Sequence, residues 1–534
     1  MDMAPPLIRV PPFPRARTRQ LATPRPTQRR SMFDVDEFID LMTSERVGGA
    51  YWGLQPPLPA AGYRLIVVAD ASARSRLLTE LQDDKPNFCP DLSQDSDPWH
   101  VIAGAAEVIV DADDELALIA AIAGLPVRCV GGGPYCFVQS RAALKKELAK
   151  HVTGFAYTNP FSGKPMSPLE AVQLSAFWRK LIDANRSISA AFGIASWKRE
   201  TVEPLMWGGA GTPVFRSSAK GVSNGEQVAA WRSKMSQKTL ADLGQQGAQL
   251  TEVEDGFIRS SGLGADCIPP QSIVVDRLGI YFDANRPSDL EQLLEQGGFP
   301  ADLVERARKL RVVIVERGIS KYAAIPAHAP ARSSAKRTIL VPGQVEDDRA
   351  VLEGGAGLTS NLELLRRVRA HAPEAHIIYK PHPDVEAGHR RGAIEEVQSR
   401  SFANEVVKGG SISQLIEAVD EAHVNTSLAG FEALLRLKPV TTYGVPFYAG
   451  WGLTTDLGPI PKRRTARRSL DELVAATLIL YPRYLDPTTG LPCPPEILVE
   501  RLADGKGTRG NPALIWLRRL QGRLRQRLTN VPNG

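Results

Sequence analysis

Three small polar residues, Asn425, Thr426 and Ser427, precede an apolar stretch that runs to Leu435. Serine and threonine cap helix N-termini, where free backbone N–H groups and the helix dipole favour a bound anion. Short apolar or β-branched segments on either side are typical of buried strands. A strand, an anion-binding turn, a helix and a second strand make half of a nucleotide-binding α/β domain. An ordinary capped helix would give the same local pattern.

Carboxylates occupy the ends of two other predicted strands. Glu254 and Asp255 end one of them, and Asp348 follows shortly after the predicted strand 337–342. Ligands of open α/β sheets lie beyond the carboxyl ends of the strands, so these acids are placed to line a ligand site. Acidic strand ends also occur without function, and Asp348 could equally cap a turn or pair with Arg349.

A further predicted strand, 376–380, leads from Lys380 into Pro381-His382-Pro383. Ammonium and imidazole groups both bind phosphate oxygens, although a lone His-Pro pair is more often structural. Together, the residues at these strand ends predict a site in which carboxylates face a cationic phosphate pocket across an interdomain cleft. Transfer of a sugar from a nucleotide needs these parts. One carboxylate stabilises or traps the oxocarbenium-like centre, another handles the acceptor proton, and cations or N–H donors take the departing phosphate.

The elements that would position these residues fall into two α/β domains. Strands alternate with helix-length segments over 151–325, which begins with a polar helical connector, and again over 337–465. Residues 272–283 predict a hairpin, and the Ala-, Pro- and Lys/Arg-rich residues 320–336 predict a linker. Residues 466–534 are predicted to be helical and to end in a basic amphipathic tail, which suits either a membrane surface or solvent.

An incomplete α/β unit is predicted over residues 33–150. Its segment 116–131 repeats the pattern of 429–444, but acidic Asp113 and Asp114 stand where the other copy has Thr426 and Ser427. Acidic residues at that point would repel a phosphate. We therefore predict a degenerate remnant of a nucleotide-binding unit; the alternative is a chance similarity of two αβ segments.

Residues 1–32 are predicted to be a disordered tail, because they are rich in proline and carry seven arginines. Hydrophobic residues make up 43% of the chain and charged residues 23%, as in soluble globular proteins. No apolar run reaches the ~18 residues that span a bilayer. The five cysteines lack metal-ligand spacing and suit a reducing cytoplasm. Neither a zinc pattern nor a helix-turn-helix or ribonucleoprotein motif is present, so nucleic acid is not an expected partner.

Several motifs, in the same order, resemble those of the capsule-polysaccharide synthesis proteins of the KpsC/KpsS type. They are Glu254–Ser260, Val341–Gln344 with Asp348, Lys380–Asp384, Asn425–Leu435 and Pro446–Thr454. The resemblance implies a GT-B-like α/β fold, in which two Rossmann-like domains face a cleft; here they would follow the degenerate partial α/β unit. It also implies a retaining β-Kdo transferase that uses CMP-Kdo as its donor substrate.

The same resemblance implies roles for individual residues. Asp348 would be the nucleophile, and Glu254 and Asp255 would do acid/base work. His382, Lys380 and Ser427 would hold the CMP phosphate, with Glu432 near the ribose or base. The other residues expected to bind substrate are Gln344, Pro383, Asn425, Thr426, Gly430 and Arg259. No cofactor and no metal are expected, because a departing nucleoside monophosphate carries less charge than a diphosphate.

The expected partners are a nucleotide-sugar donor and an anionic glycolipid acceptor, with peripheral contact at the inner face of the inner membrane and with the capsule export machinery. KpsC proteins carry two complete transferase modules, whereas this chain has one after a remnant, so we expect it to form a single linkage. Two alternatives stay open. The chain could use another CMP-sugar, as a sialyltransferase-like GT-B enzyme does, or it could be a non-catalytic scaffold of polysaccharide export.

Overall fold

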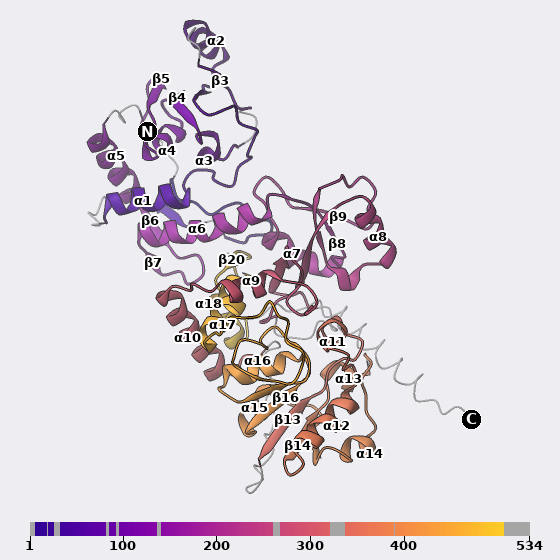
Figure 1. The fold of residues 1–534 in the computed structure, drawn as a ribbon. Helices are drawn as coiled ribbons and strands as arrows, with labels where there is room; N and C mark the ends of the chain where they lie inside the picture. The colour runs from indigo at the N-terminus through magenta and orange to yellow at the C-terminus, as the bar shows by residue number, and fades with distance from the viewer. Residues whose placement is uncertain are drawn as a thin grey trace. The chain divides into compact units, whose positions relative to one another are not determined.

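The computed structural model describes residues 6–18, 20–25, 33–81, 85–91, 95–135, 140–259, 268–320, 337–388 and 390–506 (Figure 1). The chain forms two compact units. Unit 1 comprises Met1–Ser189, Met206–Pro213 and Thr488–Leu491, and unit 2 comprises Ala190–Leu205, Val214–Pro487 and Pro492–Gly534. The predicted linker, except Ser320, and the predicted basic tail after residue 506 lie outside the described residues.

Unit 1 is built on a parallel four-stranded sheet of order β3-β2-β4-β5. Its strands are β2 (Tyr63–Val67), β3 (Asn87–Phe88), β4 (Ala105–Asp111) and β5 (Val127–Val130). The predicted helix and strand within 116–131 are confirmed as α4 (Leu116–Ile122) and β5. Two acids at the end of β4 and just after it serve local structure. Asp111 Oδ2 accepts from the Ala69 N–H at 2.7 Å, and Asp114 Oδ1 accepts from the Leu116 N–H at 2.9 Å. Other helices of the unit are α1 (Val35–Glu45), α2 (Ala71–Glu80), α3 (Pro98–Val101) and α5 (Arg141–Thr153).

The predicted disorder of residues 1–32 is wrong for the described parts of this segment. Leu7, Ile8 and Phe13 are buried, and the Phe13 ring contacts the rings of Trp178 and Trp207. Strand β1 (Ala22–Pro24) pairs antiparallel with β6 (Phe155–Thr158), which also pairs with β7 (Pro165–Met166). Composition misled here because the few apolar residues between the prolines and arginines each find a partner elsewhere in unit 1.

The helix predicted within 151–182 is confirmed in its second half, where the 18-residue helix α6 (Pro168–Asn185) begins, but this helix belongs to unit 1 and is not a connector between two domains. The domain boundary predicted at 151 thus lies nearer Ser189. On α6, the guanidinium of Arg179 is 4% exposed and meets the fully buried carboxylate of Asp97 at 2.7 Å. Arg179 also donates to the carbonyls of Arg46 and Tyr51 at 3.1 Å, so α6 fastens the loop before the sheet.

Replacing Asp97 with asparagine is expected to destabilise unit 1 by about 3–5 kcal/mol, because the buried Arg179 charge would lose its only fully buried carboxylate partner among the described residues. The check is denaturant unfolding of the full chain. Asp183→Asn provides the matched control, since Asp183 pairs with the same arginine at 2.8 Å but is 30% exposed. Asp183→Asn should lower the free energy of unfolding by no more than about 1 kcal/mol. Equal losses in both variants would contradict the assignment of Asp97 as the buried anchor.

Unit 2 contains two sheets, of which the first has seven strands in the order β20-β19-β12-β11-β10-β8-β9. Strands β8 and β9 are parallel, as are β10 and β11, while β12, β19 and β20 alternate in direction. Their bounds are β8 (Ile188–Phe192), β9 (Val214–Arg216), β10 (Gln227–Ala230), β11 (Gln249–Asp255), β12 (Ser272–Asp276), β19 (Pro482–Leu485) and β20 (Pro492–Cys493). Helices α7 (Arg199–Leu205), α8 (Gln237–Gln245), α9 (Asp289–Gln296) and α10 (Ala301–Glu316) belong to this part of the chain.

Two predictions about this sheet are wrong. The hairpin over 272–283 is absent: β12 pairs with β11 and β19, and Asp276 Oδ1 accepts from the N–H groups of Leu278 and Gly279 in the turn that follows. Residues 466–534 are not wholly helical, because β19 and β20 lie between α17 (Leu470–Val474) and α18 (Pro495–Ala503). These short strands are almost entirely buried, so their sequences lack the alternation of apolar and polar residues that would have marked them as strands.

The second sheet of unit 2 has six parallel strands in the order β15-β14-β13-β16-β17-β18. They are β13 (Thr338–Pro342), β14 (His376–Lys380), β15 (Glu405–Val406), β16 (Glu421–Val424), β17 (Val440–Thr442) and β18 (Thr455–Asp456). Counted from β13, the order is 3-2-1-4-5-6, which is that of a doubly wound nucleotide-binding sheet. Its helices include α11 (Arg349–Gly354), α12 (Asn361–His371), α13 (Pro383–Glu386), α14 (Glu396–Arg400), α15 (Ile412–Ala418) and α16 (Leu428–Leu435). The strands and the helix predicted here from the sequence are confirmed.

Candidate active site

The strand order of the second sheet reverses between β13 and β16, and two predicted residues meet there. Gln344 Nε2 donates to Thr426 Oγ1 at 2.9 Å, and the Thr426 N–H donates to Gln344 Oε1 at 2.9 Å. The Gln344 N–H in turn donates to Asn361 Oδ1 at 2.8 Å. In open α/β sheets the ligand crevice lies at this reversal, beyond the carboxyl ends of the strands. The Gln344–Thr426 pair therefore fixes the two loops that border the expected nucleotide site.

The turn from β16 into α16 has the capped form that the sequence predicts. Ser427 is the N-cap residue, and its Oγ accepts from the Ala429 N–H at 3.2 Å. The Ser427 carbonyl accepts from the buried Tyr448 hydroxyl at 2.5 Å. A Cβ atom at Gly430 would lie 2.2 Å from that hydroxyl oxygen, so the glycine permits this close packing; its contact with substrate stays a prediction.

Two other predicted substrate-binding residues of this motif are buried. Asn425 is 4% exposed, and its Nδ2 donates to the Leu358 carbonyl at 2.7 Å, which ties the turn to the loop before α12. Glu432 on α16 is 6% exposed. Asn425 thus supports the shape of the turn, while Thr426 and Ser427 are its partly exposed members.

Asp348 is the N-cap of α11, with Oδ1 accepting from the Ala350 N–H at 3.0 Å. The turn-cap alternative thus describes its local geometry. Capping leaves the side chain 49% exposed, and Oδ2 lies 4.0 Å from Arg390. Neighbouring Asp347 is equally exposed and pairs with the same arginine at 3.2 Å.

The Lys380–Pro383 motif divides into a buried half and an exposed half. The Lys380 side chain is 4% exposed; its Nζ donates to the Gly409 carbonyl at 2.6 Å and lies 3.9 Å from Glu386. Burial lowers the pKa of Lys380, against the effect of Glu386. Lys380 therefore holds the 407–410 loop rather than reaching into solvent for a phosphate.

His382 caps the short helix α13, in which the exposed Pro383 is the first residue. Its Nδ1 accepts from the Asp384 N–H at 3.1 Å. In the neutral imidazole this bond places the proton on Nε2, so Nε2–H is a hydrogen-bond donor. The geometry suits His382, more than Lys380, for an anion beyond the strand ends.

At the first sheet, the predicted acid/base pair separates into two different environments. Asp255 meets two cations, Lys198 Nζ at 3.2 Å and Arg259 Nε at 2.9 Å. Arg259 is 1% exposed and also donates to the Ile268 carbonyl, so its guanidinium is held within the protein; that it binds substrate stays a prediction. Glu254 instead accepts from the Ser233 hydroxyl at 3.3 Å.

Lys198 was missed by the sequence reasoning, since no motif surrounds it. Its Nζ lies 3.2 Å from the centre of the buried Trp231 ring, a close cation–π contact. Burial lowers the pKa of Lys198, while Asp255 opposes that shift. The backbone N–H of Trp231 donates to the Phe192 carbonyl at 2.9 Å, which sets the carboxyl ends of β8 and β10 side by side. Lys198, Ser233 and Glu254 thus lie at or beyond the carboxyl ends of β8, β10 and β11 in the first sheet.

An aromatic cluster joins the two predicted halves of the site. The Phe257 ring, just after β11, lies 4.9 Å from Phe447 and 6.3 Å from Phe431 of α16, between ring centroids. Tyr281 packs against Phe257 and Phe447 as well. The segment just after Glu254 and Asp255, at the end of β11, is therefore packed against helix α16, which Ser427 caps.

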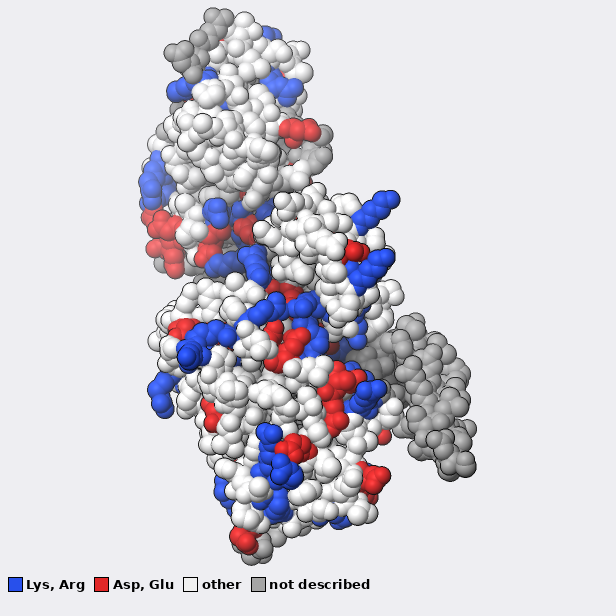
Figure 2. All heavy atoms as spheres, turned by 45° about the vertical axis from the view of Figure 1, so that its right-hand side comes forward, with Lys and Arg blue, Asp and Glu red and all other residues white. Residues whose placement is uncertain are grey.

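Charged side chains are interspersed on the face shown in Figure 2, where blue and red groups neighbour one another over the described part of the surface. Many form local pairs, as Arg306 does with Glu496 at 2.7 Å.

Within the described ranges, no group of three or more His, Cys, Asp or Glu residues could hold a metal ion. Nor is any described helix both long enough and apolar enough to cross a membrane.

Comparison with known proteins identifies relatives of this chain. Residues 226–484 match the family described as capsule polysaccharide biosynthesis protein. The capsule polysaccharide modification protein LipA of Neisseria meningitidis is 40% identical over 355 residues, 65% of this chain and 50% of LipA. The lipopolysaccharide-processing protein LpsZ of Rhizobium meliloti is 47% identical over 243 residues, 44% of this chain and 54% of LpsZ. This chain spans about half the length of these curated relatives.

Two solved structures of KpsC from Thermosulfurimonas dismutans are also similar. The β-Kdo 2,4 transferase is 30% identical with a TM-score of 0.51, covering 59% of this chain and 98% of that structure. The β-Kdo 2,7 transferase is 34% identical with a TM-score of 0.49, covering 60% of this chain and 99% of that structure. The chain belongs to the capsule polysaccharide biosynthesis family of the KpsC/KpsS type.

Proposed function

We propose that this chain is a glycosyltransferase of capsule polysaccharide biosynthesis, which transfers Kdo from CMP-Kdo to a saccharide or glycolipid acceptor with retention. The two sheets of unit 2 would act as the two domains of a GT-B enzyme. The observation that carries the proposal is the Gln344–Thr426 pair at the strand-order reversal, flanked by loops that bear Ser427, His382 and Asp348. Similarity to the KpsC β-Kdo 2,4 transferase supports the choice of sugar.

In the first step, a carboxylate oxygen of Asp348 attacks the anomeric carbon of Kdo. The bond from that carbon to the CMP phosphate oxygen breaks, and CMP leaves with the electron pair. His382 Nε2–H and the N–H groups at the start of α16 donate to the departing phosphate, where negative charge develops. No proton has to be supplied to this leaving group, because a phosphate monoester anion is stable at neutral pH.

In the second step, the acceptor hydroxyl oxygen attacks the anomeric carbon, and the bond to Asp348 breaks. The hydroxyl proton passes to a carboxylate on the first sheet. Two displacements, each with inversion, give overall retention. We assign the proton to Glu254 rather than to Asp255, because Asp255 is already engaged by Lys198 and Arg259 and fixes the turn.

The test of this function is whether CMP is released from CMP-Kdo in the presence of a Kdo-terminated glycolipid, with formation of one new linkage. CMP-sialic acid, presented separately, tests the alternative donor. No release from either donor, with any Kdo-terminated acceptor, would leave the scaffold alternative. Contact with the membrane was predicted from the basic tail, which lies outside the described residues, and stays a prediction. Contact with the export machinery was expected from the family resemblance and also stays a prediction.

His382→Asn is expected to lower turnover by ~10²–10³, the usual cost of losing one donor to a developing anion. Asparagine can still cap α13, so the local fold should persist while the Nε2–H donor is lost. The measurement is steady-state transfer together with CMP affinity. His376→Asn, at the opposite end of β14, provides the control and should retain the wild-type rate. Unchanged turnover and CMP affinity in His382→Asn would remove His382 from the phosphate site.

A further inference from the structure

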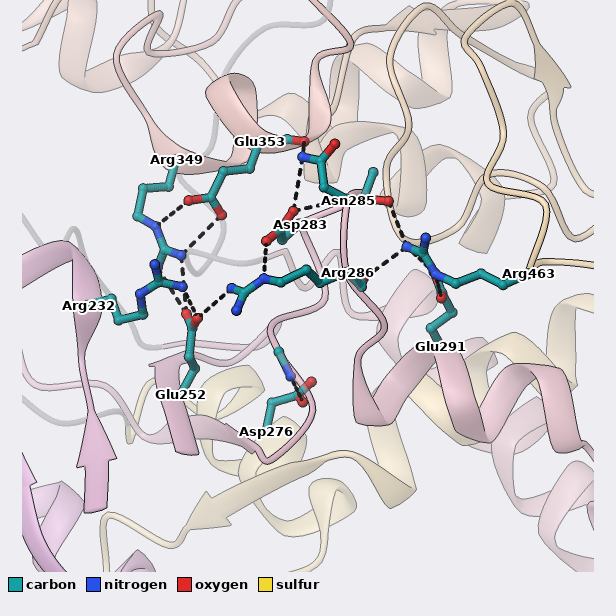
Figure 3. A network of polar contacts seen from close by, with 12 residues as sticks. Arg232, Glu252, Asp276, Asp283, Asn285, Arg286, Glu291, Arg349, Glu353 and Arg463 are labelled. Carbon is teal, nitrogen blue, oxygen red and sulfur yellow. Dashed lines mark hydrogen bonds and ion pairs between the residues drawn. The ribbon is translucent and has the colours of Figure 1, made fainter. Parts of the chain in front are cut away.

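A buried carboxylate on β11, Glu252, is shared by three arginines (Figure 3). Its side chain is 6% exposed, and it pairs with Arg232, with Arg286 at 3.1 Å and with Arg349 at 3.2 Å. Two of these arginines have a second carboxylate: Arg286 meets Asp283 and Arg349 meets Glu353. Three positive and three negative groups thus form one charge-balanced network, in which Glu252 is the common member.

Arg349 carries this network into the second half of unit 2. Both Nη atoms of its guanidinium donate to Glu252 Oε2 at 3.2 Å, while Nε and Nη2 donate to the two oxygens of Glu353. The guanidinium carbon lies 5.1 Å from the centre of the Phe282 ring. One side chain of α11 is therefore held by β11, by the segment after β12 and by its own helix.

Helix α11 depends on such contacts because it has only six residues. A helix this short has no independent stability in water. Besides Arg349, it is pinned at its end by Asn285 Nδ2, which donates to the Glu353 carbonyl at 3.1 Å, and by the Val445 N–H, which donates to the Gly354 carbonyl at 2.8 Å. Figure 3 shows Asn285 pointing toward Glu353 and the neighbouring Arg286 pointing toward Glu252, with Asp283 between them.

We propose that the Glu252–Arg349 ion pair positions the nucleophile against the acid/base carboxylate. Asp348 precedes Arg349 directly and caps the same helix. Glu252 and Glu254 are two residues apart on β11, and side chains two apart on a strand project to the same face. The pair thus fixes the start of α11 relative to the strand end that bears Glu254. Both are positioning residues, and this role rests on the proposed function.

The two steps of the reaction should respond differently to loss of the pair. Formation of the glycosyl-enzyme requires only that Asp348 is placed correctly against the donor sugar. Transfer to the acceptor also requires that Glu254 is placed correctly relative to the sugar bound on Asp348. Misplacement by about 1 Å costs on the order of 10²-fold in rate. Glu252→Gln and Arg349→Met should therefore each slow product formation by about 10²-fold, slow glycosyl-enzyme formation less, and leave CMP affinity unchanged. The double variant should be no slower than either single variant, because one interaction is lost in all three.

The experiment measures three quantities on the full chain: single-turnover glycosyl-enzyme by intact mass, acceptor product, and backbone hydrogen exchange over 345–355. Faster exchange at α11 in both variants is expected. Asp471→Asn is the control, since it breaks the Arg311–Asp471 pair between α10 and α17 and touches no site residue. Unchanged product formation in Glu252→Gln and Arg349→Met would overturn the inference. So would a loss of CMP affinity as large as the loss of product formation, or an equal loss of product formation in the Asp471→Asn control. If wild-type protein makes no product, the proposed function fails, and unchanged exchange at α11 would then overturn the positioning role separately.

Discussion

Asp348→Asn is expected to abolish sugar transfer while leaving the fold and CMP binding intact. An amide cannot attack the anomeric carbon as a carboxylate does, so no glycosyl-enzyme can form. Asparagine caps helices as well as aspartate, so the bond from the Ala350 N–H at the start of α11 can be kept. Wild-type protein given CMP-Kdo without acceptor should gain the mass of one Kdo on the peptide that contains Asp348. The variant should gain none, and calorimetry should give the same CMP affinity for both.

Asp347→Asn is the matched control for this prediction. Asp347 is adjacent, has the same 49% exposure and pairs with the same Arg390, yet we expect near wild-type transfer. Near wild-type transfer by Asp348→Asn would place the nucleophile elsewhere. Asp255 would be the next carboxylate to test, although Lys198 and Arg259 already hold it.

Glu254→Gln is expected to slow transfer by ~10²–10⁴, the usual contribution of a general base or acid. The amide cannot accept the acceptor proton. Donor cleavage in the absence of acceptor should change little, because that step needs no proton transfer from the acceptor.

Asp255→Asn tests the division of labour between the two neighbours. Its loss would leave Lys198 and Arg259, both buried, without their common carboxylate, so the main expected effect is lower stability. Thermal unfolding and transfer rate, measured on both variants, separate the two roles. A stable Asp255→Asn protein with little transfer, beside an active Glu254→Gln protein, would reverse our assignment.

The sequence was informative where structure is set locally. The Ser427 cap and the strands that end near Gln344 and Lys380 follow from short patterns of residue type, because caps and strand ends depend on their immediate neighbours.

Partners that are distant in the chain could not be predicted in the same way. Glu252 and Arg349 are 97 residues apart, and Asp255 and Lys198 are 57 apart. A charged residue in a sequence gives its charge but not its burial, which is why Arg259 and Lys380 were expected to face substrate. Folding places both among other protein groups, with 1% and 4% of their side chains exposed.

The order of strands in the first sheet of unit 2 bears on how the protein is made. Strand β12 lies between β11 and β19, yet β19 leaves the ribosome some two hundred residues after it. The six-stranded sheet is complete in the nascent chain before β19 emerges. Until then one edge of β12 offers unpaired N–H and C=O groups, a template for association with other chains. A ribosome that stalls before Pro482 would release a protein with an intact six-stranded sheet and an open edge on the other sheet, a natural target for chaperones and proteases.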